Sequence, residues 1–370
     1  MKILHILSTP RAEGTPNLVL DMLSVPGHTQ DVFVLNSEPP DLAAELSSRA
    51  AWYGQAALFR GKGLRKFLRI VSACREVCRA RRPDIVICWP TGFSSWLCAG
   101  TRLALLNRVN LLVHCGNPPS RGTWEDWISR SVLWPVWLLG AHCICCSKYV
   151  RDLYRSIPAI PDSLFSTVYN SSRAANIRVA VEAARSRQVS AQPEIENSPV
   201  AIMVATMEAH KDHATLLRAL PAIIKEWPKL LLLLVGDGSL RPGLEKLAVD
   251  LGVDSSIRFV GSSRVVPSWL ARAQIFVFST TPQEGLGSVL LEALAAGLPI
   301  LATDVPACRE VLENGKWGTL VKPGSSSDLA VAVSAIIRSN PQYDEIGLNE
   351  YLNRFTPEIM LKGYLEKALK

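Results

Sequence analysis

The sequence lacks long hydrophobic runs, internal repeats and low-complexity stretches. Residues 131–147 carry no charge, but the stretch is at the lower limit for crossing a bilayer, and Pro135 and Gly140 interrupt it. The apolar run after Met1 is too short for a signal peptide. The 24 prolines and 23 glycines follow no period, which excludes a collagen-like chain. We therefore expect neither a transmembrane helix nor a targeting segment.

The nine cysteines are an odd number spread over a long chain. This count fits reduced thiols better than a secreted disulfide framework, so we expect a reducing, cytosolic compartment. Cys143, Cys145 and Cys146 follow His142, but successive strand residues point to opposite faces and no second ligand pair is present. We expect these cysteines in a core and predict no metal site.

The chain of 370 residues is long enough for about two domains, each with its own core. Apolar residues make up 48% and charged residues 20%, which excludes a disordered chain. The net charge of +7 lies wholly in residues 1–170, because residues 171–370 carry equal numbers of acidic and basic side chains. The two halves are therefore expected to face different partners.

Residues 60–82 hold much of this basic excess and a single acid, Glu76. Their apolar residues recur at three- and four-residue spacing: Leu64, Phe67, Leu68, Val71, Cys74 and Cys78. This pattern predicts a basic amphipathic helix. Two interpretations remain open, a solvated helix packed on a sheet and a surface that attracts anionic lipid or an anionic acceptor. No nucleic-acid-binding module accompanies the basic residues, so no nucleic-acid partner is expected.

A tryptophan-rich helix is expected at residues 124–139, followed by a short strand. Its four tryptophans are Trp124, Trp127, Trp134 and Trp137. They suit either a membrane interface or a core, and we favour the core.

Short apolar runs alternate with helical patterns in both halves, which predicts parallel βαβ units and an α/β fold class. The strands expected in the first half are residues 3–7, 32–35, 85–88, 110–114 and 143–146. Those expected in the second half are residues 201–205, 230–235, 258–260, 275–278 and 299–302. Residues 171–199 are polar and lack a strand signal, so they are expected to link domains of residues 1–170 and 200–350. Two doubly wound domains facing a central cleft would place ligand-binding loops at the carboxyl ends of their strands.

The loop and helix at residues 281–299 carry the strongest signal for a ligand site. Gly285 and Gly287 let the backbone approach a ligand closely, and Ser288 is expected to cap the following helix. Backbone amides near Ser288 and Val289 would be free at the helix start. Together with the helix dipole they suit a diphosphate.

Two carboxylates flank this helix start. Glu292 lies one turn into the helix, where its side chain leans back and reaches a ribose diol beside the diphosphate. Glu284 lies in the loop and can accept hydrogen bonds from sugar hydroxyls. The pair is therefore expected to hold the two ends of one nucleotide-sugar.

The segment EGLGSVLLEALAAGLP, residues 284–299, resembles the signature of the retaining glycosyltransferases of family 4, within glycosyl transferases group 1. Further segments of the sequence resemble other motifs of that family and come in the same order along the chain: His114, the turn and helix at 146–152, VYN at 168–170, Lys211, GDGSLR at 236–241 and RFTPE at 354–358. The resemblance covers nearly the whole chain. It implies the GT-B fold, with two Rossmann-like domains and a C-terminal helix, residues 351–370, that crosses back onto the first domain.

The resemblance implies transfer of a glycosyl group from a nucleoside-diphosphate sugar with retention of configuration. It assigns Lys211 to the leaving diphosphate, Glu284 to the donor sugar and His114 to the hydroxyls near the reacting carbon. The donor would be bound by Gly14, Thr206, Gly236, Asp237, Val266, Gly285, Leu286, Gly287, Ser288, Val289 and Glu292. The sequence has no Asp-x-Asp motif for a metal-bridged diphosphate, so no metal and no cofactor besides the donor are expected.

Two positions depart from the family pattern. Thr206 stands where the family usually has an arginine, five residues before Lys211. The first loop has a single glycine, Gly14, where two are usual. Loss of the arginine removes a bidentate phosphate partner, which either Lys211 with the helix amides or another cation such as Arg11 would replace.

The implied acceptor is a hydroxyl of a glycan, a lipid-linked molecule or a small molecule, in polysaccharide or glycolipid biosynthesis. The expected location is the cytoplasm, with residues 60–82 as a contact to the inner face of the membrane. Closure of the domains about residues 171–199 would exclude water from the donor. Two alternatives remain open, a catalytically degenerate GT-B protein that binds nucleotide or a partner enzyme, and a sugar-nucleotide epimerase of the same fold.

Overall fold

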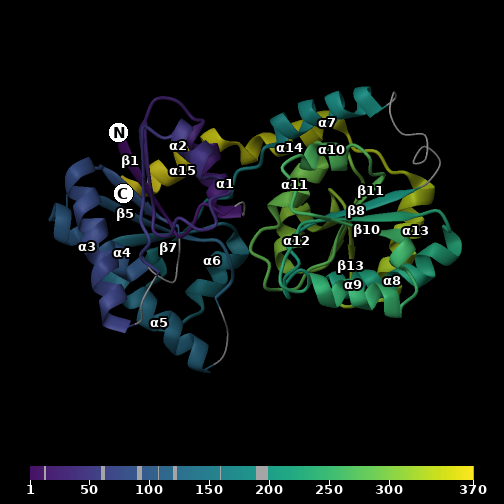
Figure 1. Ribbon diagram of the computed structural model, residues 1–370, viewed down its shortest axis with the longest axis horizontal. Helices are drawn as coiled ribbons and strands as arrows, with labels where there is room; N and C mark the ends of the chain where they lie inside the picture. Colours follow the sequence, from purple (N-terminus) through teal and green to yellow (C-terminus); the bar gives the residue numbers. More distant parts are fainter. Residues whose placement is uncertain are drawn as a thin grey trace. The chain divides into compact units, whose positions relative to one another are not determined.

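The chain folds into two compact units (Figure 1). The computed structural model describes residues 1–11, 14–59, 63–89, 94–106, 108–119, 123–158, 160–188 and 199–369. Unit 1 comprises Met1–Ser171 and Pro357–Lys370, and unit 2 comprises Ser172–Thr356. Each unit therefore has its own sheet and core, and the last segment of the chain belongs with the first.

Within its described residues, unit 1 contains a seven-stranded parallel sheet in the order β3-β2-β1-β4-β5-β6-β7. Its strands are β1 (Lys2–Leu7), β2 (Thr29–Val34), β3 (Trp52–Gln55), β4 (Ile85–Cys88), β5 (Asn110–Cys115), β6 (Ala141–Cys145) and β7 (Phe165–Thr167). Its helices are α1 (Gly14–Leu23), α2 (Ala43–Arg49), α3 (Gly63–Arg81), α4 (Ser94–Leu105), α5 (Thr123–Leu138), α6 (Lys148–Arg155) and α15 (Pro357–Ala368). The central strand β4 is buried along its whole length, as expected for a sheet covered on both faces.

Unit 2 contains a six-stranded parallel sheet in its described part, in the order β10-β9-β8-β11-β12-β13. Its strands are β8 (Val200–Val204), β9 (Leu231–Val235), β10 (Ile257–Gly261), β11 (Ile275–Phe278), β12 (Ile300–Thr303) and β13 (Thr319–Val321). Its helices are α7 (Ala174–Gln188), α8 (His213–Glu226), α9 (Arg241–Asp250), α10 (Val266–Leu270), α11 (Ser288–Ala295), α12 (Pro306–Val311), α13 (Ser326–Ser339) and α14 (Glu345–Leu352).

Each sheet reverses its strand order at one position. In unit 1, β1 lies between β2 and β4, with Ile3 paired to Ile85. In unit 2, β8 lies between β9 and β11, with Ala201 paired to Ile275. Such a reversal leaves a crevice at the carboxyl ends of the two strands, because the connections leave toward opposite sides. In unit 2 this crevice lies between the loops that follow β8 and β11.

The α/β, doubly wound interpretation is confirmed, and all ten predicted strands are present. Strands β3, β7 and β13 were missed by the sequence reading. All three lie at sheet edges, and β7 and β13 have three residues each. Edge strands this short bury too few side chains to produce a clear apolar run.

The segment predicted as a linker, residues 171–199, contains α7, which packs against α10 and α11 of unit 2. The linker interpretation is therefore wrong for residues 174–188. The helix buries Ile177 and Val181, one turn apart, and its remaining surface is polar enough to hide the pattern. Residues 189–198 of the predicted linker lie outside the described residues.

The C-terminal crossing begins later than predicted. Helix α14 and the short turn after it stay in unit 2, and the chain passes to unit 1 between Thr356 and Pro357. Helix α15, yellow in Figure 1, lies among the purple and blue elements of unit 1. It packs against α1 and buries Met360, Leu361 and Tyr364 in that core.

The predicted basic helix is α3, but its apolar residues are not all buried. Ile70, Cys74 and Cys78 are inaccessible to solvent, whereas Leu64 is 70% and Leu68 55% exposed. The single apolar face that was expected is therefore wrong at Leu64 and Leu68, in the first two turns. The helix packs against α4, and two of its predicted basic residues, Arg60 and Lys62, lie outside the described residues.

Arg81 of α3 and two tryptophans of α5 have surroundings that differ from those predicted. The Arg81 guanidinium holds the buried Asp31 carboxylate through two hydrogen bonds, of 2.9 and 3.2 Å, so this cation is part of the structure of unit 1. Trp134 and Trp137 pack edge to face and are 36% and 37% exposed, so for these two the expected core position is wrong. No helix in the described ranges is both long and apolar enough to span a bilayer.

Gly236 lies in the loop after β9, where its backbone packs against the loop after β8. Its φ of +139° is rare for other residues, and a Cβ at this position would clash with the Ala205 carbonyl. Gly243, inside α9, has open space around the position of a Cβ. The two glycines therefore make a matched pair for substitution.

We predict that Gly236→Ala lowers the free energy of unfolding by about 2–4 kcal/mol, because backbone atoms of both loops must move. Gly243→Ala is predicted to raise it by up to about 1 kcal/mol, through helix propensity alone. Urea unfolding of both variants measures the difference. Equal stability of the two variants would contradict the packing described for the Gly236 loop.

Candidate functional site

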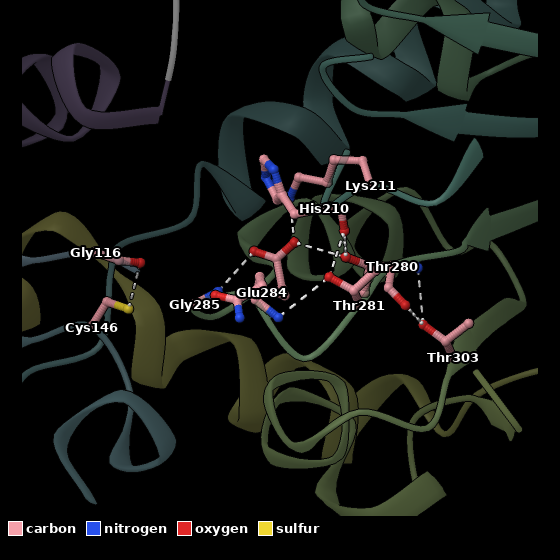
Figure 2. A network of polar contacts seen from close by, with 10 residues as sticks. Gly116, Cys146, His210, Lys211, Thr280, Thr281, Glu284, Gly285 and Thr303 are labelled. Carbon is pink, nitrogen blue, oxygen red and sulfur yellow. Dashed lines mark hydrogen bonds and ion pairs between the residues drawn. The ribbon is translucent and has the colours of Figure 1, made fainter. Parts of the chain in front are cut away.

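Lys211 and Glu284 form an ion pair at the crevice of unit 2 (Figure 2). Lys211 comes from the loop after β8, and Glu284 from the loop after β11, 73 residues further along the chain. The exposed fraction of their side chains is 15% for Lys211 and 8% for Glu284. The Lys211 ammonium also lies over the ring of Phe278, 5.1 Å from its centroid. Two of the three predicted catalytic residues are thus in contact.

The backbone carbonyl of His210 holds the two loops together. It accepts hydrogen bonds from the backbone N–H of Thr281 at 3.0 Å and from the Thr280 hydroxyl at 2.7 Å. Thr303, at the end of β12, accepts from the Thr280 N–H at 3.0 Å and donates to the Thr280 carbonyl at 2.9 Å. These bonds, drawn in Figure 2, position Lys211 and Glu284 from three neighbouring strands.

The Glu284 carboxylate is held in its charged form. Burial by itself raises the pKa of this group, but the Lys211 ammonium and the Gly285 N–H, at 3.2 Å, outweigh burial and leave its pKa below the ordinary 4.5. Burial, followed by the Lys211 charge, lowers the pKa of the neighbouring His210. The site therefore contains one compensated pair of charges, and the His210 imidazole is disposed to remain neutral near pH 7.

Helix α11 begins differently from the prediction. Gly287 is the N-cap residue, in the left-handed conformation with φ +75°, and no side chain caps this end. Ser288 is the first helical residue, so its predicted role as the cap is wrong. A left-handed cap position favours glycine because it has no Cβ to clash, and here a Cβ would press on Phe278 and Leu290.

The other predicted donor-binding residues of the second half lie in loops and helix starts that follow strands of unit 2. Thr206 follows β8, Gly236 and Asp237 follow β9, Val266 begins α10 after β10, and Gly285, Leu286, Gly287, Ser288, Val289 and Glu292 follow β11. The Asp237 carboxylate accepts from the Gly238 N–H at 2.8 Å and pairs with Arg241 at 3.1 Å, so it orders its own turn. Gly285, Leu286 and Gly287 are buried, and Ser288, Val289 and Glu292 are half-buried.

Gly14 and His114 belong to unit 1. Gly14 is exposed at the start of α1, in the loop region after β1. His114, the third predicted catalytic residue, lies one residue before the end of β5 and is 2% exposed. Its Nδ1 is 2.7 Å from the hydroxyl of Tyr364, and burial lowers its pKa to about 4. The imidazole is therefore neutral near pH 7.

The sequence reading missed the residues that support the ion pair. Phe278, Thr280, Thr281 and Thr303 were not singled out, although each lies at or just after the end of a predicted strand. The position after a strand was the available signal. All nine cysteines are buried and none forms a disulfide, and no cluster of three or more His, Cys, Asp or Glu side chains suited to a metal is found in the described ranges.

Residues 198–339 match the family model described as Glycosyl transferases group 1. We refer to residues 198–339, which match this model, as the group 1 glycosyltransferase domain. This domain contains the Lys211–Glu284 pair, the loops after β8 to β11 and all of α11.

Curated relatives of this chain include the lipopolysaccharide core biosynthesis glycosyltransferase LpsE of Rhizobium meliloti (strain 1021). It is 31% identical over 173 residues, which cover 46% of this chain and 49% of LpsE. A phosphatidyl-myo-inositol mannosyltransferase of Mycobacterium tuberculosis (strain ATCC 25618 / H37Rv) is 36% identical over 131 residues, which cover 35% of this chain and 33% of the relative. The chain spans about half or less of the length of these relatives.

Solved structures show the fold of the whole chain. The Anabaena Alr3699/HepE structure in complex with UDP and glucose has a TM-score of 0.81 at 18% identity and covers 99% of this chain and 98% of its own. WaaG, a glycosyltransferase involved in lipopolysaccharide biosynthesis, has a TM-score of 0.68 at 15% identity, with 98% of each chain covered. The fold of the whole chain is thus the GT-B fold that these solved structures share.

The ion pair generates a prediction about stability. Lys211→Met and Glu284→Gln are each expected to lower the free energy of unfolding by about 3 kcal/mol at pH 7, because each leaves a buried group without its partner. The double variant is expected to lose clearly less than the sum of the two losses. Urea unfolding of the four proteins gives the coupling energy. Additive losses would contradict the ion pair.

A matched control is the Arg338–Glu226 pair, whose side chains are 62% and 38% exposed. Its coupling energy is expected to be below about 1 kcal/mol.

The pH dependence of the ion pair follows from the sign of the Glu284 shift. Because the pKa of this carboxyl is lower in the folded protein than its ordinary 4.5, its stabilisation is complete above that value and is lost as the pH falls through the folded-state pKa. The stability difference between the wild type and Glu284→Gln should therefore be constant above about pH 5.5 and shrink at lower pH. A constant difference down to about pH 3 would contradict the shift.

Proposed function

We propose that the protein is a retaining glycosyltransferase that moves a sugar from a nucleoside-diphosphate sugar to an acceptor hydroxyl. The observation that carries this proposal is the Lys211–Glu284 pair at the strand-order reversal of the group 1 glycosyltransferase domain. Ligands of doubly wound sheets bind at this position. Lipopolysaccharide core and glycolipid glycosyltransferases among the relatives favour an acceptor in polysaccharide or glycolipid biosynthesis.

Each side chain of the pair has a separate role in this proposal. The Lys211 ammonium stabilises negative charge that develops on the departing diphosphate, and the amides at the start of α11 assist it. The Glu284 carboxylate accepts hydrogen bonds from hydroxyls of the donor sugar. Because the two are paired with each other, donor binding exchanges their mutual contact for contacts with phosphate and sugar. Glu292, one turn into α11, is assigned to the ribose.

The proposed reaction is a front-face displacement with a closed proton balance. The bond between the anomeric carbon and the diphosphate oxygen breaks, and the acceptor oxygen bonds to the same face of that carbon. The acceptor proton passes to the departing phosphate oxygen. The diphosphate therefore serves as the base, and charge is stabilised by Lys211 and backbone amides without a metal ion.

Thr206 makes the phosphate site less cationic than the family pattern. A hydroxyl donates one hydrogen bond and carries no charge, whereas arginine donates several and is always charged. Thr206 is half-buried in the loop that also holds Lys211, so it is placed to contact a phosphate oxygen. Lys211 is consequently the main cation that this part of unit 2 offers to the donor diphosphate.

We infer that the protein acts in the cytoplasm and that α3 contacts an anionic membrane surface. The exposed Leu64 and Leu68 lie on the same helix as the exposed Arg65 and Arg69. Apolar side chains beside cations suit the interface of an anionic bilayer, where the former insert and the latter bind headgroups. The partly exposed Trp134 and Trp137 of α5 add amphipathic rings to unit 1. The nine buried thiols fit a reducing compartment.

The donor is tested with a panel of UDP-, GDP- and ADP-sugars. One nucleotide-sugar is expected to raise the melting temperature and to be hydrolysed slowly, with release of its diphosphate. Glu284→Gln is expected to lower that turnover roughly 100-fold, because an interaction of the transition state is lost. Glu226→Gln removes a carboxylate of the exposed Arg338 pair and should leave turnover unchanged.

The alternatives give different results in this panel. Stabilisation without release of diphosphate, with and without glycan and lipid-linked acceptors, favours a degenerate nucleotide-binding protein. An isomeric nucleotide-sugar formed without acceptor favours an epimerase. Equal turnover of the wild type and Glu284→Gln would remove Glu284 from the reaction.

Membrane binding is tested by sedimentation with vesicles that contain anionic lipid. Simultaneous reversal of Arg65, Lys66 and Arg69 to Glu is expected to lower the partition coefficient by at least about 100-fold, since each cation near the surface contributes about 1 kcal/mol. Reversal of Lys225, Lys229 and Lys246, exposed in unit 2, changes the net charge equally and serves as the control. Equal binding of the two triple variants would argue against α3 as the contact.

A further inference from the structure

Four aromatic side chains form a buried column in unit 1. His5 comes from β1, Trp89 follows β4, His114 comes from β5 and Tyr364 comes from α15. The Trp89 ring stacks on His5 at 6.0 Å and on Tyr364 at 5.9 Å, and lies 4.9 Å from the His114 ring. None of the four is more than 3% exposed. Their polar atoms must therefore pair with one another or with nearby backbone.

One end of this column shows how such pairing selects a tautomer. The Trp89 Nε1–H can only donate, so the His5 Nδ1 that it contacts at 3.3 Å must accept. The proton of neutral His5 then lies on Nε2, which donates to Gln30 Oε1 at 3.0 Å. Burial lowers the pKa of His5 to about 4, so the ring is neutral near pH 7. In this series of hydrogen bonds, from Trp89 through His5 to Gln30, each N–H donor has an acceptor.

The same reasoning applies to His114 and Tyr364. The Tyr364 side chain is inaccessible to solvent, and its hydrogen bond with the described residues is the 2.7 Å contact to His114 Nδ1. If this hydroxyl only accepted, its own hydrogen would be buried without an acceptor among those residues. The balanced arrangement has Tyr364 donating and Nδ1 accepting. Burial raises the pKa of Tyr364 and lowers that of His114 to about 4, so both groups are neutral.

The other imidazole nitrogen lies at the carboxyl end of β5. A Cβ at Gly116, two residues after His114, would be 2.9 Å from Nε2. This edge of the ring therefore lies directly against the half-buried backbone of the loop that follows the strand. Loops at this end of a parallel sheet are the ligand-binding ones.

The position of Tyr364 depends on a close approach of α15 to the sheet. The preceding residue is Gly363, where a Cβ would be 2.8 Å from Val168 Cγ1. A larger residue would move the helix away from the core that Tyr364 shares with Trp89. The contact between residues 114 and 364 is thus built into the packing of α15.

We propose that Tyr364 is a positioning residue that holds His114 as the neutral tautomer with its proton on Nε2. In this form Nε2 carries the proton, so it can donate a hydrogen bond but cannot act as a general base. It suits an oxygen acceptor, such as a sugar hydroxyl or a phosphate oxygen. Use of this donor by a substrate rests on the proposed function, whereas the tautomer is a property of the protein alone.

The tautomer is measured by long-range ¹H–¹⁵N correlation of the full chain labelled at its histidines. The six imidazoles are resolved by their two nitrogen shifts, and His114→Gln assigns the signal of interest. For the wild type we expect a protonated Nε2 and an unprotonated Nδ1. Tyr364→Phe is expected to lower the ratio of the Nε2–H to the Nδ1–H form by about fivefold or more, since one buried hydrogen bond is lost.

Tyr351→Phe is the matched control, because the buried Tyr351 hydroxyl donates to the Val311 carbonyl in unit 2. It should leave the His114 signals unchanged. A wild-type His114 with its proton on Nδ1, or an unchanged ratio in Tyr364→Phe, would overturn the proposal. If Tyr364→Phe does not fold, the wild-type spectrum alone decides.

Kinetics separate this proposal from the proposed function. With an active donor, Tyr364→Phe is expected to lower kcat by the factor by which the NMR spectrum shows the population of the Nε2–H form to fall, with little change in KM. An Nε2–H tautomer in a protein that turns over no donor would refute the transferase and leave the role of Tyr364 standing. Active transfer by a protein whose His114 carries its proton on Nδ1 would refute the role of Tyr364 and leave the proposed transferase standing.

Discussion

Parallel strand pairing is the constraint on which both units depend. Two parallel neighbours need a long connection between them, usually a helix, so every strand of a sheet ends at the same edge. The loops at that edge collect residues that are far apart in the sequence. Lys211 and Glu284 meet there because β8 and β11 are neighbours in the sheet. The threonines around them belong to the same edge, where they tie one loop to the next.

The charges of the candidate site are balanced before any ligand enters. A largely buried ammonium beside a buried carboxylate offsets part of the desolvation cost that either would have alone. An anionic ligand that takes the ammonium also releases the carboxylate, which then needs hydroxyl or amide donors of its own. A molecule with phosphate at one end and hydroxyls at the other satisfies both groups together. Phosphate alone would satisfy only one of the two groups, so in the proposed function the pair favours a nucleotide-sugar over a nucleotide.

Central strands and the glycine-rich loop before α11 were predictable, because long apolar runs and glycines are local signals. The edge strand β3 and helix α7 were not, since they bury few side chains. The N-cap of α11 was predicted one residue late, at Ser288, because the sequence does not show which glycine adopts the left-handed conformation. Contacts such as His114 with Tyr364, 250 residues apart, follow from topology and packing and have no spacing that reveals them. The central cleft and the donor-binding roles stay predictions.

Helix α15 gives the two units different folding histories. Unit 2 is one continuous stretch of chain, so all of its residues can meet as soon as that stretch has been synthesised. Unit 1 begins earlier but ends later, because its core includes side chains of α15 that are made after the whole of unit 2. During synthesis the core of unit 1 therefore stays incomplete while the second unit forms, and the apolar side chains that α15 later covers remain exposed. The part of the chain made first is the part completed last.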